Sequence, residues 1–390
     1  MTEVVVVAAR RTPFGKLGGG LASLRAVDLG AVVIRGVLDE TGTAPADVQQ
    51  LIMGTVLAAG QGQVPSRQAG LLAGLPASVP SFTVNKVCAS ALKAINLGAL
   101  LIRAGEADVI VAGGMESMSR APYLLEDQRF GARFGDRVAV DSMQRDGLCC
   151  PIDGVLMGVH GDQVADELGV SREQQDHWSA RSQQRYAEAH AAGRFADELL
   201  SVETVRGLVD TDEQPRAGTT VERLAALAPA FGPGGTVTAG NAPGINDGAS
   251  AVLLMSADRA RAAGLTPLAR WLGSGETAAE HPYLATVPAT AIENALARTR
   301  GEVGITDLAL LEINEAFAAV AITSCRMLEV DEERVNVNGG AVAIGHPIGA
   351  SGGRLFATLI HELRRRGGGY GAASMCSGLA QGEAALVQVG

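Results

Sequence analysis

The chain has 390 residues, of which 47% are hydrophobic and only 4% aromatic, and its length fits two or three domain-sized units. The formal net charge of −10 and the lack of a basic tail argue against nucleic-acid binding. A local arginine or a helix N-terminus could still hold an anionic small molecule.

The cysteines and the N-terminus indicate a soluble protein of a reducing compartment, which we expect to be the cytoplasm. The five cysteines include no CxxC pair and no Cys/His metal spacing, so we expect neither a disulfide framework nor a structural zinc site. The run MTEVVVVAARRTPFG is too short in its apolar part, and too soon charged, for a signal peptide. No uncharged apolar run of about 18 residues occurs, so no transmembrane span is expected.

Strand-like and helix-like segments alternate in the first part of the chain. VVVVAA (4–9) predicts a buried strand, residues 26–41 have helical apolar spacing, and LIMGTVLA (51–58) predicts a second strand. SFTV (81–84) is typical of an extended segment and leads to Cys88. This alternation predicts a parallel or mixed sheet with helices packed on its faces.

The segment after Cys88 predicts the most apolar helix of the chain. Residues 89–103 are apolar nearly all round, broken mainly by Lys93 and Asn96, and such a helix belongs in the middle of a protein. DVIVAGG (108–114) then predicts a strand that glycines close.

Residues 119–245 are richer in charge and glutamine, and we interpret them as a long insertion, part helix and part loop. Residues 165–200 predict two polar-faced helices. Ser171, with Gln174 three residues later, predicts a capping box at a helix start.

From about residue 246 the alternation of apolar strand-like and helix-like segments resumes. Three segments resemble earlier ones: 306–322 resembles 46–59, 334–367 resembles 81–105, and 372–378 takes the place of 108–114. The likeness predicts two similar halves, although two ordinary β–α units would share some of these features by chance.

Cys88 admits two interpretations on its local sequence. Free cysteines are commonly buried as small apolar residues. At a helix N-terminus, however, the helix dipole and free backbone N–H groups favour a thiolate, and the small residues 89–91 leave room for a substrate.

Two further candidates lie in glycine-flanked loops of the second half. His346 lies in NGGAVAIGHPIGASGG (338–353), where glycine turns permit a ligand to approach and a histidine could serve as general base to a thiol. The glycine order matches neither the Rossmann nor the P-loop pattern. Cys376 lies in SMCSGLAQG (374–382), after an apolar strand and before glycines.

The remaining polar candidates are weaker. Asn314 and Glu315 lead into an apolar helix, where they could cap it or place a polar group deep in a site. We expect the other five histidines at the surface and the other three cysteines in packing roles: His160, His177, His190, His281, His361, Cys149, Cys150 and Cys325.

Together these motifs resemble the thiolases, the acetyl-CoA acetyltransferases and 3-ketoacyl-CoA thiolases. The resemblance runs from ARRTPFGK (9–16) to the C-terminus and rests on NKVCASALKAI, GGMESMSRAP, TAGNAPGINDGA, INEAFA, NVNGGAVAIGHPIGASG and MCSG. It implies the α/β thiolase fold, with two similar βαβαβαββ halves in a five-layered α/β/α/β/α core. The halves would be 1–118 and 246–390, and the inserted loop domain, 119–245, would bind coenzyme A.

The resemblance also implies a division of labour. Cys88 would accept the acyl group, His346 would take its proton, and Cys376 would act as acid and base at the substrate α-carbon. Asn314 would hold a water that, with His346, stabilises one thioester oxygen. Backbone N–H groups of Cys88 and Gly378 would form a second oxyanion hole. Acyl transfer and C–C bond formation both create oxyanions, which need preorganised donors in a dry site.

The expected substrate contacts are less complete than the reacting groups. Met157 would flank the acyl pocket, Arg216 would stack on or pair with the nucleotide end, and Phe317 would also contact the substrate. Pro243 stands where many thiolases have a serine, which removes a hydroxyl expected to contact the pantetheine arm.

Other positions also depart from the family pattern. Leu156 stands where a histidine or asparagine often precedes the pocket methionine, GVHGD (158–162) replaces a commoner GxTAE, and Ala228 replaces a frequent basic residue. These changes affect the grip on coenzyme A and the size of the acyl pocket rather than the reacting groups.

Three functions therefore compete: an active thiolase, a condensing enzyme of the ketoacyl-synthase type, and a thiolase-like acyl-CoA-binding protein without turnover. Ketoacyl synthases use a cysteine with two histidines, so Asn314 favours a thiolase; Pro243 and Leu156 keep the third reading open. We expect coenzyme A as a cosubstrate, no bound cofactor or metal, and no nucleic-acid or membrane partner. The family suggests a homodimer or homotetramer, with residues 120–145 as a tetramer contact.

Overall fold

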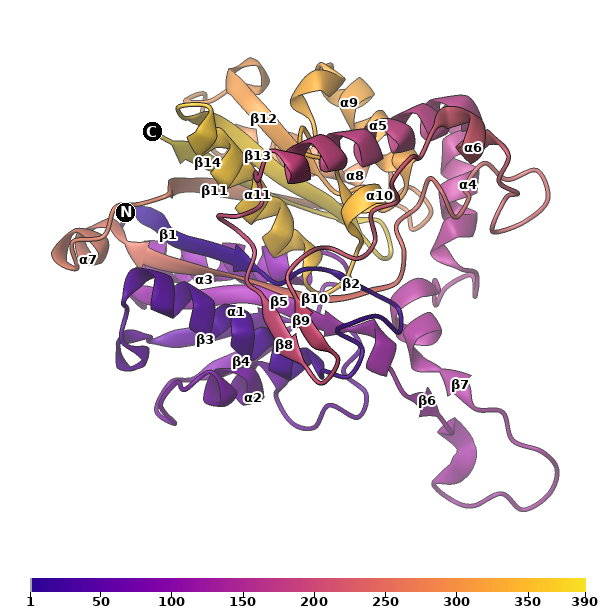
Figure 1. The fold of residues 1–390 in the computed structure, drawn as a ribbon, viewed down its shortest axis with the longest axis horizontal. Helices are drawn as coiled ribbons and strands as arrows, with labels where there is room; N and C mark the ends of the chain where they lie inside the picture. The colour runs from indigo at the N-terminus through magenta and orange to yellow at the C-terminus, as the bar shows by residue number, and fades with distance from the viewer. Residues whose placement is uncertain (1) are drawn as a thin grey trace.

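The computed structural model describes residues 2–390, and the elements of the first half lie close to where the apolar patterns place them (Figure 1). They are β1 (Val4–Arg11), α1 (Ala26–Thr41), β3 (Gln50–Gly54), α2 (Pro65–Leu72), β4 (Ser81–Val84), α3 (Ser90–Ala104) and β5 (Val109–Ser117). One strand is shorter than expected. Of the expected residues 51–58, β3 includes only those up to Gly54. The Thr55 N–H still donates to the Val84 carbonyl of β4 at 3.1 Å, but the N–H groups of Val56 and Leu57 donate to the buried carboxylate of Glu116 and no longer pair with a strand.

From β11 (Ala269–Ala278) onward, the second half repeats this order of elements. It contains β10 (Asn246–Ser256), α7 (Ala257–Ala262), β11, α8 (Val287–Ala297), β12 (Leu308–Ile313), α9 (Ala318–Leu328), α10 (Ala341–Ile344), α11 (Ser351–Arg365), β13 (Gly369–Ser377) and β14 (Gln381–Val389). Of these, β10 completes the sheet of the first half by pairing with both β5 and β1.

Strand pairing confirms the internal repeat that the sequence echoes suggest. The strand order is β12-β13-β14-β11-β1-β10-β5-β3-β4, and it is symmetric about the short β1–β11 pairing at Val4–Val6. In the first half β3 pairs with β5 in parallel, and the pairings β5–β10 and β10–β1 are antiparallel. In the second half β12 pairs with β13 in parallel, and the pairings β13–β14 and β14–β11 are antiparallel. An isolated parallel bridge between Leu311 and Val335 stands where β4 stands in the first half.

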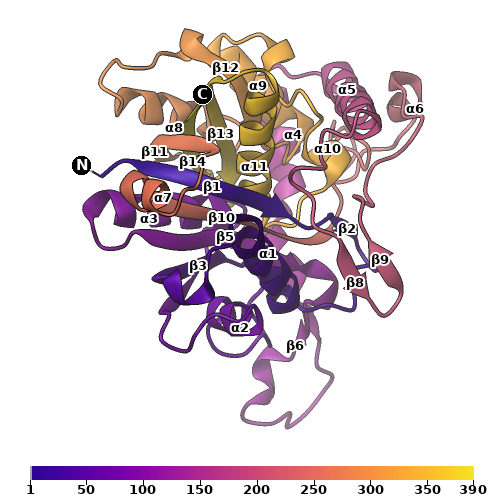
Figure 2. The same cartoon turned by 60° about the vertical axis from the view of Figure 1, so that its left-hand side comes forward.

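The helices form three layers around the two halves of this sheet. Helices α3 and α11 lie between the halves, α1 and α2 cover the outer face of the first, and α8 and α9 cover the outer face of the second (Figures 1 and 2). The central helices touch closely: a Cβ at Gly352 would lie 2.6 Å from the backbone nitrogen of Leu92. The result is the expected five-layered α/β/α/β/α core.

Helix α3 confirms the prediction of an apolar helix in the middle of the protein. The window Val87–Ala104 is long and apolar enough by composition to cross a membrane, yet 56% of it is buried inside this fold. A core helix of a large protein passes the same compositional test. Its place between the two halves of the sheet accounts for its composition.

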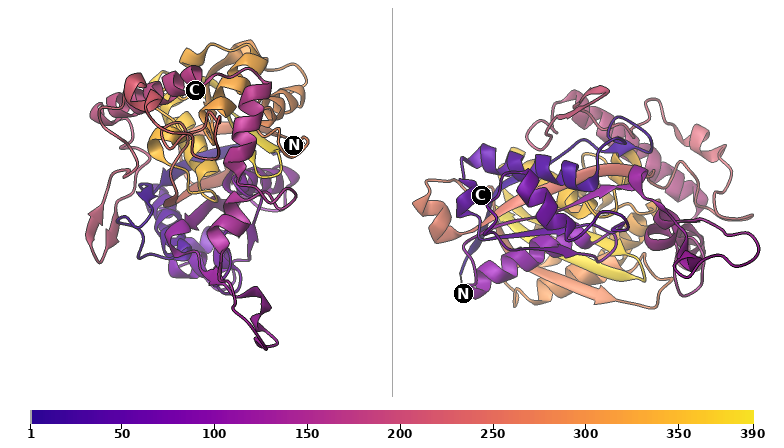
Figure 3. Two further views of the ribbon diagram at one scale, coloured as in Figure 1. Left: turned by 90° about the vertical axis from the view of Figure 1, so that its right-hand side faces the viewer. Right: turned by 90° about the horizontal axis from the view of Figure 1, so that it is seen from below.

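Residues 118–245 form the connection between β5 and β10. They include β6 (Tyr123–Leu124), β7 (Val140–Asp141), a π-helical turn (Met143–Leu148), α4 (Met157–Glu167), α5 (Arg172–Ala191), β8 (Val202–Thr204), β9 (Gly207–Val209) and α6 (Val221–Ala225). The segment around β6 and β7 projects from the body of the molecule as an arm (Figures 1 and 3).

The two helices expected within 165–200 are only partly right. Helix α5 is one of them, and Ser171 starts it as predicted: its Oγ accepts the Gln174 backbone N–H at 3.2 Å, and Gln174 Oε1 accepts the Ser171 N–H at 2.9 Å. Residues 165–167 are instead the end of α4, and α5 ends at Ala191. The polar residues 192–200 continue as turns.

Candidate active site

Cys88 lies in a hydrogen-bonded turn between β4 and α3. Val87, just before it, has a φ of +44°, a conformation that costs a β-branched residue about 1–3 kcal/mol. Hydrogen bonds hold the turn: Ser90 Oγ donates to the Val87 carbonyl at 2.6 Å and accepts the Lys86 N–H at 2.9 Å. The strained turn thereby presents Cys88 at the start of the central helix α3.

The thiol of Cys88 is partly accessible and neutral in the resting site. Burial of its sulfur raises the pKa to about 12, although the backbone N–H groups of Cys88 and Gly378 favour the thiolate and oppose the shift. The expected effect of the helix N-terminus is therefore present but smaller than the effect of desolvation. Cys88 needs a base to become a nucleophile.

His346 is held as a neutral base by one chain of hydrogen bonds. Ser351 Oγ donates its only proton to the Pro347 carbonyl at 2.9 Å, so it must accept from His346 Nδ1–H, 2.6 Å away. This fixes the tautomer in which Nε2 is unprotonated and carries the lone pair. Burial lowers the pKa of His346 to about 3, so the ring is uncharged at neutral pH.

The backbone around His346 is also specified. Gly345 has a φ of +108°, which favours glycine, and a Cβ there would lie 2.6 Å from the amide of Asn246. Asn246 Oδ1 in turn accepts the backbone N–H of His346 at 2.9 Å. The last turn before β10 therefore positions the histidine loop.

Asn314 lies beside the unprotonated nitrogen of His346. Its Nδ2 is 3.4 Å from His346 Nε2, and its Oδ1 is buried with no hydrogen-bond partner among residues 2–390. A buried amide oxygen without a partner is costly, and a water or a substrate oxygen between the two groups would relieve that cost. The geometry fits the expected place of Asn314 in an oxyanion site.

Cys376 is the penultimate residue of β13 and is buried. Burial raises its pKa well above the ordinary value, and the neighbouring Cys88 adds to the shift. The turn after it, with positive φ at Leu379 and Ala380, is tied to the Cys88 turn by a hydrogen bond from Ser377 Oγ to the Lys86 carbonyl. The two thiols thus belong to one site.

The expected substrate contacts divide into two groups. Met157 and Phe317 pack in the same apolar cluster as Cys376, and Phe231 meets the Phe317 ring edge-on, with centroids 6.5 Å apart. Arg216 lies exposed outside that cluster and donates from Nη1 to the Ala239 carbonyl at 2.8 Å.

Three other expected positions belong to the insertion. Pro243 is half-buried shortly before β10 begins. Leu156 is the N-cap residue of α4, and Ala228 is exposed.

The structure separates the roles left open for Asn314 and Glu315. Asn314 faces His346, whereas Glu315 accepts hydrogen bonds from Trp178 Nε1 at 2.9 Å and Ser182 Oγ at 2.8 Å. It also accepts the backbone N–H of Val342 at 3.0 Å. Glu315 therefore fastens α5 of the insertion to the second half.

Glu116 is a buried residue that the sequence analysis did not single out. Its carboxylate accepts the Thr55 hydroxyl at 3.0 Å and the backbone N–H groups of Val56 at 2.9 Å, Leu57 at 3.2 Å and Gly349 at 3.0 Å. Burial raises its pKa to about 7. A lone acid inside the apolar run VIVAGGMES was the available signal. Glu116 joins the histidine loop to the loop after β3.

Several expectations for the minor residues need correction. His160 and His361 are 2% exposed rather than at the surface, and His361 Nε2 lies 2.9 Å from the Ala9 carbonyl, which links α11 to β1. His177 and His190 are exposed and His281 is half-buried. Cys325 of α9 packs in an apolar cluster as expected, and all five cysteines are free thiols.

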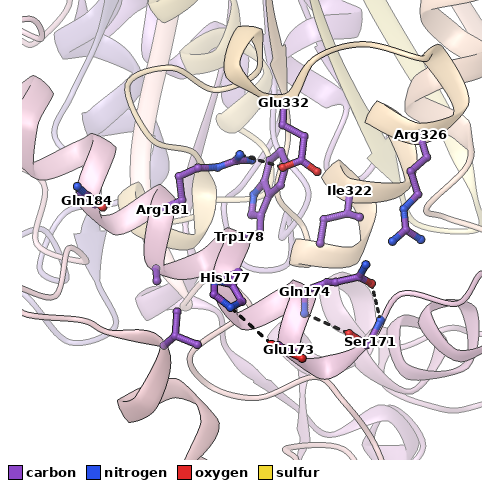
Figure 4. A pocket seen from close by; sticks show the side chains of 12 residues that line it. Ser171, Glu173, Gln174, His177, Trp178, Arg181, Gln184, Ile322, Arg326 and Glu332 are labelled. Atoms are coloured by element: carbon purple, nitrogen blue, oxygen red, sulfur yellow. Dashed lines mark hydrogen bonds and ion pairs between the residues drawn. The ribbon is translucent and has the colours of Figure 1, made fainter.

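A pocket of about 760 Å³ lies apart from these groups, between α5 and α9 (Figure 4). Its polar side chains are largely paired with one another. Arg181 contacts Glu332 at 2.8 Å and lies over the Trp178 ring at 4.3 Å. None of the candidate reacting residues lines it, so the pocket is a seam between α5 and α9 rather than the site of chemistry.

Comparisons with known proteins show which family this chain resembles. Residues 4–258 match the family described as "Thiolase, N-terminal domain", and residues 265–389 match "Thiolase, C-terminal domain". Acetyl-CoA acetyltransferases of Pseudomonas aeruginosa and Cupriavidus necator are 49% and 47% identical, with 98% and 100% of both chains covered. A crystal structure of the Bacillus anthracis acetyl-CoA acetyltransferase has a TM-score of 0.96 at 38% identity and covers 100% of this chain and 99% of that one.

Proposed function

The chain belongs to the thiolase family, and from this premise we propose that it interconverts two acetyl-CoA molecules with acetoacetyl-CoA and coenzyme A through an acetyl–Cys88 intermediate. Full-length relatives that are 45–49% identical carry the name acetyl-CoA acetyltransferase, one of them with the qualifier "probable". The observation that supports the residue roles is the hydrogen-bond chain from His346 through Ser351 to the Pro347 carbonyl, which leaves His346 Nε2 unprotonated and facing Asn314.

The first half-reaction uses both neutral thiols. Cys88 gives its proton to His346 Nε2 while its sulfur attacks the thioester carbonyl. The C–S bond to coenzyme A then breaks, and the leaving thiolate takes the proton of Cys376. The products are acetyl–Cys88, free coenzyme A, an imidazolium at His346 and a thiolate at Cys376. Burial disfavours each charge alone, so the pair is expected to form together.

The second half-reaction restores the resting state. The Cys376 thiolate removes an α-proton from the second acetyl-CoA, and the resulting carbanion attacks the acetyl carbonyl on Cys88. Cys88 leaves as a thiolate and recovers its proton from His346. The oxyanion formed at each stage would be stabilised by the water site at Asn314 and His346 or by the N–H groups of Cys88 and Gly378.

Substrate binding is assigned by the same reasoning. The apolar cluster with Met157, Phe231 and Phe317 beside Cys376 supports a short acyl pocket. Coenzyme A would extend along the insertion toward the exposed Arg216. Restriction to acetyl groups is part of this proposal, because longer 3-ketoacyl-CoA substrates share the same chemistry.

We also propose a homotetramer in a reducing, cytoplasmic compartment. The arm around β6 and β7 carries two strongly exposed aromatic side chains, Phe130 at 91% and Phe134 at 94%. Apolar side chains exposed in this way on a projecting segment are typical of contact surfaces. The five free thiols fit a reducing environment. Light scattering of the intact chain, compared with a Phe130→Ser/Phe134→Ser variant, would test the assembly.

Steady-state assays in both directions test the function. The purified chain is expected to cleave acetoacetyl-CoA in the presence of coenzyme A and to discriminate against longer 3-ketoacyl-CoAs. Incubation with labelled acetyl-CoA should label Cys88, identified by mass spectrometry, and Cys88→Ala should abolish both labelling and turnover.

Other outcomes would favour the competing functions. Thiolysis of long chains in preference to acetoacetyl-CoA would replace the acetyl assignment with a broader ketoacyl thiolase. Tight binding of acyl-CoA without turnover at any chain length would indicate a binding protein. Condensation that depends on a carrier-protein thioester would indicate the ketoacyl-synthase chemistry.

A further inference from the structure

A second cluster of chemically active side chains lies where the insertion meets the second half. One ligand-type atom from each of Cys150, Asp153, His160 and His281 lies within 4.8 Å of the others. Both imidazoles approach the same carboxylate oxygen: Nε2 of His160 and Nε2 of His281 are each 2.8 Å from Asp153 Oδ2. Three separate segments of the chain therefore converge on one point.

The local backbone fixes the first three of these residues. Cys150 and Asp153 share a tight turn, in which the Cys150 N–H donates to the Val155 carbonyl at 2.8 Å and the Gly154 N–H donates to the Cys150 carbonyl at 2.9 Å. Helix α4 begins just after this turn and carries His160 near its start. The turn and the helix place the side chains of Cys150, Asp153 and His160 next to His281, which lies in the loop between β11 and α8.

Burial shows that the cluster has a closed side and an open side. Cys150 and His160 are 1% and 2% exposed, whereas the side chains of Asp153 and His281 are 38% and 35% exposed. The Nδ1 atom of His160 is buried and has no hydrogen-bond partner among the described residues 2–390. The protein's own hydrogen bonds thus leave this buried imidazole half-satisfied, which is costly unless another interaction is gained.

The donor set selects a class of ligand. One thiolate, two imidazoles and one carboxylate are the ligands that zinc takes in four-coordinate sites. Mg²⁺ and Ca²⁺ prefer oxygen ligands and octahedral or larger shells, which a single carboxylate does not supply. A thiolate and a carboxylate would also neutralise a divalent charge. Tetrahedral ligands at roughly 2.0–2.3 Å from a metal lie about 3.3–3.8 Å apart, so the cluster needs only small side-chain movements.

We propose that Cys150, Asp153, His160 and His281 bind one zinc-class divalent ion that fastens the insertion to the second half. The ion is structural, because four protein ligands leave no open position for a substrate. It is also separate from the reacting thiols. Zinc binding here would overturn our sequence-based expectation of no metal. That expectation rested on Cys/His spacing, which does not reveal this cluster because His281 lies far along the chain from the other three residues.

The place of the cluster gives the ion a consequence for the acyl pocket. Met157 stands one turn before His160 on α4, and Tyr283 follows His281 by two residues. Both side chains pack against the apolar cluster that contains Phe317 and Cys376. An ion that joins α4 to the His281 loop would hold one wall of that cluster in place.

Metal titration of the full-length chain tests the proposal. Protein dialysed against a chelator is titrated with Zn²⁺, followed by calorimetry, and with Co²⁺, followed by absorption. We expect one ion per chain, the visible bands of tetrahedral Co²⁺, and a thiolate-to-cobalt charge-transfer band. Zn²⁺ should raise the melting temperature, since a ligand that binds only the native state stabilises it.

Matched variants assign the ligands. His281→Ala, at a half-exposed position, should lose the stoichiometric ion and the thermal shift, while His177→Ala, an exposed histidine of the insertion, should keep both. Cys150→Ser should lose the charge-transfer band, while Cys149→Ser at the adjacent position should keep it. Far-ultraviolet circular dichroism of the metal-free variants shows that each is folded.

Two results would overturn the proposal. One is a wild-type chain that binds neither ion above background, which would leave the cluster as a carboxylate shared by two imidazoles. The other is binding that survives His281→Ala but disappears in Cys88→Ser, which would place the ion on the reacting thiols.

Discussion

The two halves of the molecule use one architecture for different tasks. Glu116 and Cys376 are each the eighth residue of a nine-residue strand, β5 or β13, and each pairs with a glycine of the neighbouring strand, Gly248 or Gly382. In the first half this position holds a carboxylate that binds loop N–H groups. In the second half it holds a thiol.

The same comparison extends to the loops that surround these positions. Thr55 follows β3 and donates to Glu116, whereas Asn314 follows β12 and lies beside His346. The turn with Cys88 leads into α3, and the loop with His346 leads into its counterpart α11. The residues that we propose to react thus lie at equivalent places in the two halves, and Glu116 occupies the place that corresponds to Cys376.

The connection to the last strand differs most. Residues 378–380 join β13 to β14 by a tight turn, whereas residues 118–245 join β5 to β10. The tight turn brings the Gly378 N–H to Cys88. The long connection supplies α4, α5 and the segment before β10. In the proposed function, the short turn supplies an oxyanion donor and the long connection supplies the coenzyme A surface.

Cys376→Ala removes the thiol that we propose as the acid–base group of the second half, and it should have the largest effect. We expect condensation and thiolysis of acetoacetyl-CoA to fall by about 10²–10⁴-fold, the usual contribution of a general acid–base group. Acetyl transfer from acetyl-CoA to Cys88 should remain detectable by mass spectrometry, because that step needs Cys376 only to protonate the leaving thiol. Retained condensation would contradict the division of labour between the thiols. Cys325→Ala, a packing cysteine in α9, is the control.

Ser351→Ala tests how the second half turns a buried histidine into a base. Without the hydroxyl, His346 Nδ1–H loses its acceptor and the tautomer is no longer fixed. We expect kcat to fall by about 10²-fold with little change in KM, at the lower end of a general-base contribution. Ser324→Ala removes a similar buried hydroxyl from α9, where Oγ donates to the Val320 carbonyl at 2.8 Å. That control should leave kcat unchanged, and equal losses in both variants would reduce Ser351 to a packing role.

Glu116→Gln tests the structural role of the matching position in the first half. The amide would turn an NH₂ group toward backbone N–H donors, so we expect a loss of about 1–3 kcal/mol in the free energy of unfolding. Urea denaturation measures it. Glu276→Gln is the matched control, since that carboxylate lies in a surface ion-pair cluster with Lys86 and Lys93.

The pH dependence of the same variant carries a definite sign. Burial raises the folded-state pKa of Glu116 from 4.5 to about 7, so its folded form binds a proton more tightly than its unfolded form. The stability that it contributes is present below about pH 4.5 and is lost as the pH rises through 7. That part of the pH dependence should vanish in Glu116→Gln. An unchanged slope between pH 5 and 7.5 would show that Glu116 is ionised throughout this range.

The sequence was most informative where the chemistry resides in short motifs. Cys88, His346 and Cys376 each lie at the junction of an apolar element with a small-residue loop, so local pattern and resemblance both indicate them. Ser351 and Glu116 were missed because their hydrogen bonds depend on partners that only the fold brings close. The end of β3 at Gly54 was also misjudged, because the backbone N–H groups of Val56 and Leu57 donate to Glu116, a carboxylate about sixty positions away.

Pro243→Ser gives the smallest expected change and tests the long connection itself. Pro243 lies in the segment that returns to β10, and it lacks both the hydroxyl and the N–H that a serine would offer to the pantetheine arm. One added hydrogen bond contributes about 0.5–1.5 kcal/mol, so the KM for coenzyme A in thiolysis should fall about 2- to 12-fold with kcat unchanged. The more flexible unfolded chain of the variant should lower its stability by up to about 1 kcal/mol. Pro233→Ser, in an exposed loop of the same connection, should lower stability without changing KM. If both variants leave KM unaltered, the arm of coenzyme A runs elsewhere, and the second half would carry substrate binding as well as chemistry.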